Sequence, residues 1–316
     1  MMTTKHQKKN NYQLPFHKRL GKDLMRNKAL YLMLVPVLAY YLIFCYYPMY
    51  GAQIGFKDFS PALGIEGSPW VGLKHLKAFF NSVYCERVIR NTLTINFLSL
   101  LIAFPAPIVL AIMLNEVRNK FFKKTVQTIS YLPHFISTVV ISGMILQFTA
   151  TDGFITSFLT LFGYERQNLL YNPDLFQIVY VLSDVWQGIG WGSIIYIAGI
   201  AGINGELYEA ARIDGAGRLR QIFHVTLPGI KGLIVTMFIL KIGNMMSLGY
   251  EKIILIYNSS IYETADVIST FVYRKGIIDM DYSFSTAVGL FNSVINLILL
   301  CTANTLSKKL TEDSLW

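Results

Sequence analysis

Glu209-Ala-Ala-Arg-Ile-Asp-Gly-Ala216 forms a short polar stretch between two long apolar segments, 175–203 and 230–250, and is followed by Phe223 and by Leu227-Pro228. Lipid covers most of the surface of a chain that crosses a membrane. An amphipathic stretch with fixed charges and a helix-stopping glycine is therefore a candidate docking surface for a soluble partner. The segments on either side of it decide the fold.

The composition is typical of an integral membrane protein. Of the 316 residues, 53% are hydrophobic, 14% are aromatic and only 15% are charged, and the mean hydropathy is +0.43. This is too apolar for an ordinary soluble domain. A helix needs roughly 20 residues to cross about 30 Å of hydrocarbon. The uncharged windows that exceed this length are 29–56, 91–115, 125–151 and 282–307.

Two more windows, 175–203 and 230–250, have the required length but contain charges: Asp184 in the first, and Lys241 in the second, which also has Lys231 at its start. We therefore predict an all-α membrane protein with six transmembrane helices; a soluble helical protein with a buried core is the alternative. The expected parts are a basic tail (1–28), a six-span domain (29–306) and a second tail (307–316). The six spans are expected at 29–50, 91–115, 126–149, 175–203, 229–250 and 283–306, with a loop (204–228) between helices four and five.

The distribution of basic residues predicts the orientation. If the amino terminus is inside, the inner segments hold 18 Lys and Arg and the outer segments hold nine. Loops on the cytoplasmic side carry the excess of Lys and Arg, so both termini and the 204–228 loop are expected in the cytoplasm. The basic residues flank spans and do not cluster with aromatic residues on a soluble face, so nucleic acid is not an expected partner.

No motif for catalysis or nucleotide binding is present in the sequence. There is no phosphate-binding loop, no His-Glu-x-x-His, no serine elbow and no Cys/His cluster. Gly215-Ala-Gly217 is followed by Arg220 where a dinucleotide fingerprint needs glycine. We therefore expect no enzyme activity, no cofactor and no metal in this chain, and any energy must come from a partner.

The 204–228 loop is predicted to form two short helices. Asn204 is a suitable cap for a helix that begins near Gly205. Asp214 is expected to cap a second helix, with the joint at Gly215, and Pro228 is expected in the first turn of the next span. The second helix would carry an apolar stripe of Leu219, Ile222 and Phe223.

The 204–228 loop resembles a motif of a known family. Glu209-Ala-Ala, Asp214-Gly215-Ala216, Phe223 and Leu227-Pro228 resemble the EAA loop of transmembrane permease subunits of type I ATP-binding-cassette (ABC) importers. Three other segments resemble the polysaccharide and complex-oligosaccharide branch of that family, which is related to maltose-type and alginate-type permeases. These are Tyr47-Pro-Met-Tyr-Gly-Ala-Gln-Ile-Gly-Phe-Lys-Asp58, Tyr131-Leu-Pro-His-Phe-Ile136 and Gly249-Tyr-Glu-Lys-Ile253.

The resemblance implies a bacterial cytoplasmic-membrane permease that works by alternating access. It implies as partners an ABC ATPase dimer that binds ATP and Mg, a second homologous permease subunit, an extracellular or periplasmic solute-binding protein, membrane lipid and a sugar substrate. It also implies that the loop docks on the ATPase through coupling helices. The corresponding residues here are Glu209, Ala210, Ala211, Asp214, Gly215, Ala216, Phe223, Leu227 and Pro228.

The substrate path is less evident from the sequence. Asp184 and Lys241 lie about 12 Å and about 14 Å from the outer ends of their spans, at 1.5 Å rise per residue, so they are at similar depth and either pair with each other or hold the cargo. Aromatic and amide side chains that suit sugars accompany them, although packing is the alternative role for each: Trp186, Gln187, Trp191, Tyr196, Asn244 and Met245. Gly188-Ile-Gly-Trp-Gly192 is interpreted as a close-packing face.

Three other functions remain as alternatives. An ABC permease for a non-sugar solute would carry the same loop. An ion-driven secondary transporter would have broken helices in two repeated halves, and no such repeat is evident. A non-transporting membrane scaffold or sensor would not depend on Glu209 or its neighbours.

Overall fold

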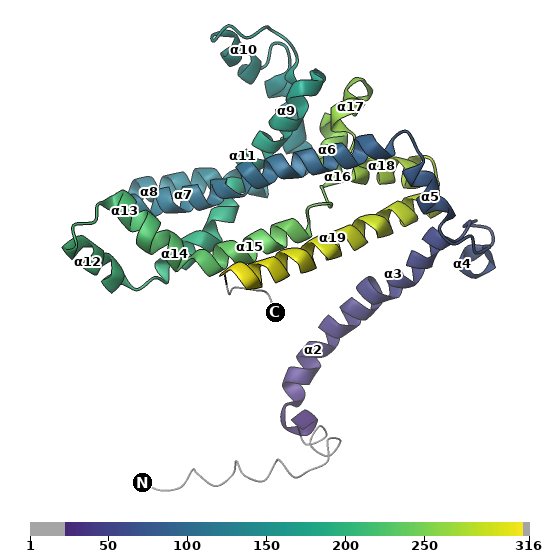
Figure 1. Ribbon diagram of the computed structural model, residues 1–316, viewed down its shortest axis with the longest axis horizontal. Helices are drawn as coiled ribbons and strands as arrows, with labels where there is room; N and C mark the ends of the chain where they lie inside the picture. Colours follow the sequence, from purple (N-terminus) through teal and green to yellow (C-terminus); the bar gives the residue numbers. More distant parts are fainter. Residues whose placement is uncertain (1–22, 312–316) are drawn as a thin grey trace. The chain divides into compact units, whose positions relative to one another are not determined.

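The computed structural model describes residues 23–311, and the outer parts of the predicted tails, 1–22 and 312–316, lie outside the described residues. Between residues 23 and 311 the chain forms helices and no strand, apart from one isolated bridge between Lys57 and Trp70. The chain divides into two compact units, Met1–Gln53 and Ile54–Trp316 (Figure 1).

The first unit contains a long apolar helix. α2 (Lys28–Tyr40) continues through the π-helical η1 (Tyr41–Tyr46) and α3 (Tyr47–Met49). The helix extends over Lys28–Phe56 with a mean hydropathy of 2.0, so it is long and apolar enough to cross a membrane.

Three segments of the second unit meet the same criterion: Cys85–Glu116, Thr138–Thr160 and Tyr282–Lys309. Their helices are α6 (Cys85–Leu98), η3 (Ser99–Ala103), α7 (Pro105–Glu116), α9 (Thr138–Thr149), α10 (Phe154–Thr160) and α19 (Tyr282–Thr311). Two bent pairs add one span each if each pair counts as one: α11 (Pro173–Ala201) with α12 (Gly205–Ile213), at 71°, and Arg218–Gly229 with α15 (Lys231–Gly243), at 63°. The described part of the chain therefore has four to six spans, in agreement with the predicted all-α class.

The predicted third span, 126–149, is interrupted in the structure. α8 (Lys120–Tyr131) ends at a short 3₁₀ turn, η4 (Leu132–Phe135), and α9 starts only at Thr138, capped by the Ser137 hydroxyl. Pro133 lies in this turn, where it cannot donate a helical hydrogen bond and disfavours a helix at the residue before it. The prediction of one continuous span was wrong because the hydropathy averaged over a window does not detect a helix break at a proline.

The predicted fifth span, 229–250, is also shorter than expected. α15 ends at Gly243, and the chain turns through 244–249 before α16 (Tyr250–Ile256). Asn296 of α19 holds this turn: its oxygen accepts the Met246 N–H at 2.8 Å, and its amide donates to the Ser247 hydroxyl at 2.7 Å. Non-helical backbone at membrane depth requires such partners, since lipid offers none.

α11 packs against several neighbours in the second unit. One buried cluster joins its Phe176 and Val181 to α9 and α16, and another joins its Tyr196 and Ile200 to α7. Two glycines of the predicted close-packing face allow close approach: an added Cβ would overlap the Ser130 carbonyl of α8 at Gly190 and come within 3.0 Å of Pro107 at Gly192. The prediction is wrong for Gly188, where an added Cβ meets nothing within 4 Å. Helices in lipid are held together by such packing rather than by exclusion of water.

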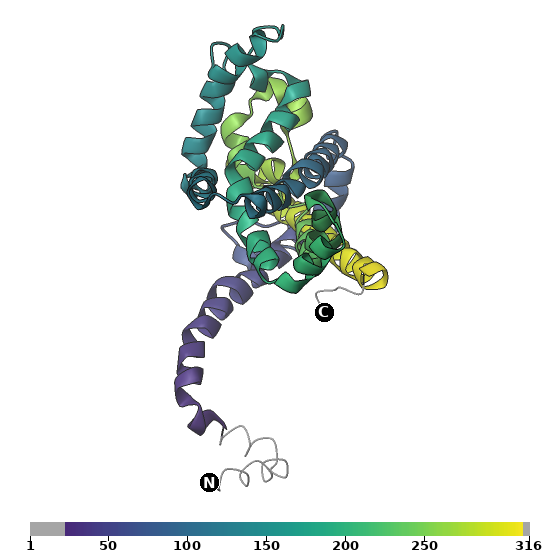
Figure 2. The ribbon, with the colours of Figure 1, turned by 90° about the vertical axis from the view of Figure 1, so that its left-hand side faces the viewer.

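The 204–228 loop lies at one end of the second unit. Figure 1 shows α12 and α13 (Arg218–Gln221) at the left end of this unit, and Figure 2 presents that end to the viewer. Both helices project from the long helices α11 and α15, which carry the loop at their ends.

Candidate functional site

The 204–228 loop consists of two helices that meet at a glycine. The Asn204 oxygen accepts a hydrogen bond from the Glu206 N–H at 3.0 Å, so the predicted cap of α12 is confirmed. After Asp214 the backbone of Gly215 has a φ of +75°, a conformation that favours glycine. The second helix is composed of α13 (Arg218–Gln221), η6 (Ile222–Thr226) and α14 (Leu227–Gly229).

Two predicted details of this loop are wrong. Asp214 does not cap the second helix but closes α12, where its N–H bonds to the Ala210 carbonyl at 3.0 Å. The reason is that the chain turns through Gly215 and only then enters α13. Pro228 does not open the next span, because it lies in α14 and the chain bends before Lys231.

The loop presents uncovered apolar side chains. Leu207 is 53% exposed, Ile213 87%, Leu219 72% and Phe223 63%. Among the predicted docking residues, the exposed ones are Glu209, Ala210, Asp214, Gly215, Phe223 and Pro228, and the partly buried ones are Ala211, Ala216 and Leu227. Apolar and small side chains on an otherwise polar element are typical of a protein interface.

The base of the loop is fixed to the rest of the second unit. The Tyr208 hydroxyl lies 3.0 Å from the Thr226 hydroxyl, which links the two helices of the loop. Ile203 and Leu227 pack against the cluster that contains Tyr196 and Ile200 of α11. A displacement of the loop would therefore be transmitted to α11 and α7 through direct packing.

An ion pair between a buried lysine and a partly exposed carboxylate joins α16 to α11. The Lys252 ammonium is 2.6 Å from the Asp184 carboxylate and 3.5 Å from the Gln187 side-chain oxygen. It also lies 5.4 Å from the centroid of the Tyr180 ring. The Lys252 side chain is 7% exposed and that of Asp184 is 34% exposed, so the carboxylate is the more accessible partner.

The expected pairing of Asp184 with Lys241 is wrong. Lys241 is exposed in the last turn of α15, whereas the turn through 244–249 brings Lys252 of α16 against α11. Lys252 was not among the predicted pathway residues because it falls between the predicted fifth and sixth spans, 229–250 and 283–306. The apolar residues Ile253 to Ile256 that follow Lys252 are the signal that indicated a buried helix.

The other predicted pathway residues do not form one cluster. Trp191 stacks on His134 of η4, with ring centroids 4.5 Å apart, and Phe135 meets the same indole edge-on. Tyr196 is buried among apolar side chains. Asn244 donates to the Leu240 carbonyl, Met245 is partly buried beside it, and Trp186 lines an apolar pocket that does not include Asp184.

Lys252 is expected to need its partner for stability. Breaking a buried ion pair from one side costs about 3–5 kcal/mol, because it leaves an unpaired buried charge. Asp184→Leu should therefore lower the thermal midpoint strongly in detergent, and Asp184→Leu/Lys252→Met should recover part of the loss. Lys241→Met, at an exposed position, serves as the control. An equal loss in the single and double variants would contradict the pairing.

A second buried charge network lies near the start of α6 and was not predicted. Asp266 accepts hydrogen bonds from Arg87 at 3.0 Å and from Arg274 at 2.7 Å. Burial is the largest single influence on Arg274 and opposes its charge, but the hydrogen bonds and charge interactions with Asp266 and Tyr257 together outweigh it, so the pKa of Arg274 is raised. Arg87 and Asp266 are 179 positions apart in the sequence, so no local pattern predicts their contact.

Comparison with known proteins places the chain in a family. The model of the "Binding-protein-dependent transport system inner membrane component" family matches residues 103–312. The polygalacturonan/rhamnogalacturonan transport system permease protein YteP of Bacillus subtilis (strain 168) is 45% identical over 95% of this chain and 94% of its own length. Protein LplB of the same organism is 45% identical over 93% of this chain and 92% of its own length.

Solved structures show the same fold. The crystal structure of a bacterial ABC transporter involved in the import of the acidic polysaccharide alginate matches with a TM-score of 0.85 and 42% identity, over 93% of this chain and 99% of that chain. The alginate transporter in complex with its alginate pentasaccharide-bound periplasmic protein matches with a TM-score of 0.86 and 41% identity, over 94% of this chain and 100% of that chain.

The comparisons confirm the family that Glu209 and its neighbours indicated, together with the predicted type I importer permease fold. The family is one of transporter permeases and not of enzymes. This chain belongs to the family of binding-protein-dependent transport system inner membrane components.

Proposed function

We propose that this chain is the permease subunit of an ATP-driven importer that carries oligosaccharides, or sugars derived from polysaccharides, across the cytoplasmic membrane by alternating access. The observation that carries the proposal is the 204–228 loop. It projects two helices with uncovered apolar side chains from the ends of α11 and α15, in a family of transport permeases.

The energy for transport comes from a separate ATPase dimer that binds ATP and Mg. The sequence of this chain has no phosphate-binding loop, while Leu219 and Phe223 supply an apolar face for a groove on a partner. ATP-driven closure of the ATPase dimer moves the loop. The packing of Ile203 and Leu227 against α11 transmits this motion to the spans.

The cargo assignment rests on the relatives. YteP, at 45% identity, is named for polygalacturonan and rhamnogalacturonan, and the matching solved importer is involved in the import of alginate. A second candidate is a small phosphorylated solute, because sn-glycerol-3-phosphate permeases UgpA are related at 28% identity or less. The much higher identity to YteP favours a saccharide.

A second homologous permease and a solute-binding protein complete the importer. The matching alginate transporter was solved in complex with its periplasmic protein. We place both termini and the 204–228 loop in the cytoplasm, an orientation that the distribution of Lys and Arg favours. The tails 1–28 and 307–316 then flank a six-span domain on the same side.

Within the spans, the accessible carboxylate of Asp184 and the amide of Gln187 are suited to hold sugar hydroxyl groups. Lys252 holds the Asp184 carboxylate in place from the buried side. Trp191, stacked on His134, offers a flat ring to a sugar face. Tyr196 and Asn244 have packing and capping roles instead.

Loss of the Phe223 side chain is expected to weaken the contact of the 204–228 loop with the ATPase. Phe223→Ala removes an exposed ring, so the fold should be kept, but substrate-stimulated ATP hydrolysis by the purified complex and uptake into vesicles should each fall at least tenfold. Phe121→Ala is a matched control, because Phe121 is 81% exposed at the start of α8 on the same predicted side. Equal losses in both variants, or uptake unchanged in Phe223→Ala, would refute docking through this loop.

A further inference from the structure

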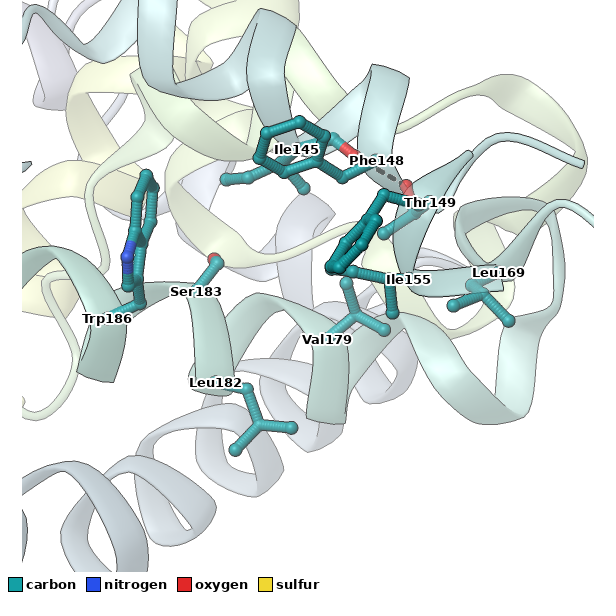
Figure 3. Close-up of a pocket in the computed structure, with 10 residues that line it drawn as sticks. Ile145, Phe148, Thr149, Ile155, Leu169, Val179, Leu182, Ser183 and Trp186 are labelled. Carbon is teal, nitrogen blue, oxygen red and sulfur yellow. Dashed lines mark hydrogen bonds between the residues drawn. The ribbon is translucent and has the colours of Figure 1, made fainter. Parts of the chain in front are cut away.

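The second unit contains an apolar pocket apart from the ion pair and the 204–228 loop. It has a volume of about 340 Å³ and lies between α9, α10, η5 (Leu169–Tyr171) and α11. Figure 3 shows Trp186 at one end of the pocket and Leu169 at the other, with Val179 and Ile155 between them. The remaining lining residues are Ile145, Phe148, Thr149, Phe154, Leu182 and Ser183.

Apart from the indole N–H of Trp186 at one end, the pocket offers no free hydrogen-bond donor. Its two hydroxyls are already used: Thr149 donates to the Ile145 carbonyl at 2.6 Å, and Ser183 donates to the Tyr180 carbonyl at 2.6 Å. An ordered water needs two to four polar partners, and a sugar needs more. The pocket is therefore suited to an apolar ligand and not to the cargo.

The rim is apolar as well and lies open to the surroundings of the chain. Phe154 is 74% exposed and Leu182 is 52% exposed, while Thr149 and Leu169 form a buried floor. In a membrane protein the surroundings of such a rim are lipid tails, which are as apolar as the rim itself. An acyl chain can thus enter the pocket without exposing any surface to water.

A cationic side chain, Arg166, is held close to the lining of the pocket. Arg166 lies three residues before Leu169 of the floor, and its Nε donates to the Thr151 carbonyl at 3.1 Å, two residues after Thr149. This bond fixes the base of an exposed guanidinium whose outer N–H groups remain available. An arginine fork of this kind matches a phosphate group.

We propose that this pocket binds one acyl chain of a membrane phospholipid whose phosphate is held by Arg166. The apolar lining selects the tail, and the guanidinium fixes the headgroup at the end of the pocket near Thr151. The bound lipid fills the space between α10 and α11 and acts as a structural ligand of the permease. This site is independent of the proposed transport function.

Native mass spectrometry of the full-length chain, in the complex with which it purifies, tests the site. We expect one phospholipid per chain to survive delipidation in mild detergent. Val179→Phe places a ring in the pocket and should reduce this occupancy at least tenfold, and Arg166→Gln should reduce it several-fold. Val109→Phe, at an exposed position of α7 outside the pocket, should retain the lipid.

Fluorescence gives a second readout that does not depend on a pocket-filling variant. With Trp70, Trp191 and Trp316 replaced by Phe, Trp186 reports from the pocket. Preloading with a phosphatidylglycerol brominated on its acyl chains should quench Trp186, and the quenching should persist after transfer to detergent. Equal lipid retention in Val179→Phe and Val109→Phe, or complete recovery of fluorescence in detergent, would overturn the proposal. A crosslink from Leu182→Cys to the second permease subunit in place of lipid would also overturn it.

Discussion

Gly190→Ala is expected to prevent normal packing of α11 against α8. An added Cβ would overlap the carbonyl group of Ser130 and come within 2.8 Å of the Tyr131 nitrogen. Both contacts are to backbone, which cannot rotate away, so the two helices must separate. Overpacking typically costs about 1–3 kcal/mol, and contacts to backbone on both sides place this substitution at the upper end of that range. The measurement is the thermal midpoint and the fraction of monodisperse protein in detergent.

Gly188 provides a matched control in the same helix. An added Cβ at Gly188 meets nothing within 4 Å, and alanine favours a helix over glycine by about 1 kcal/mol. Gly188→Ala should therefore keep or slightly raise the thermal midpoint. If Gly190→Ala behaved like Gly188→Ala, the close crossing of α11 and α8 would be wrong.

The fold class and the family were predictable from the sequence because both depend on local patterns. Long apolar windows identify spans by length alone, and the stretch from Glu209 to Pro228 contains several family residues close together. The cap at Asn204 and the joint at Gly215 also follow from local preferences and appear in the structure.

The details that failed depend on contacts between distant residues. The turn through 244–249 is held by Asn296 of α19, which no window around residue 244 contains. The same turn decides that Lys252 rather than Lys241 meets Asp184. The pairing of Asp184 with Lys241 was predicted from their similar depth in two spans. That prediction failed because the fifth span does not continue as one unbroken helix.

The buried carboxylate of Asp266 is expected to make a large contribution to stability near the start of α6. Its carboxylate is fully buried and accepts hydrogen bonds from Arg87, Arg274 and the Thr270 hydroxyl. The Asn91 amide donates to the Asp266 carbonyl at 2.9 Å. The network ties α6 to α18 (Ile268–Tyr273) and to the turn before it.

Asp266→Ala is expected to lower stability by about 3–5 kcal/mol, because two partly buried guanidinium groups would lose their counterion. The expected readouts are a large drop in the thermal midpoint and faster hydrogen exchange in α6 and α18. Asp266→Asn keeps the shape and one acceptor, so its loss should be smaller. Asp266→Ala/Arg274→Met should recover part of the loss, as interacting residues do in a double-mutant cycle.

Substitution of Glu263 serves as a control that distinguishes the effect of a buried carboxylate on stability from the effect of net charge. It pairs with Arg90 at 2.8 Å on the same face, but both side chains are more than half exposed. Exposed pairs contribute about 0–1 kcal/mol, so Glu263→Gln should change the thermal midpoint little. A loss in Glu263→Gln as large as in Asp266→Ala would show that net charge on this face, and not the buried carboxylate, stabilises the junction between α6 and α18.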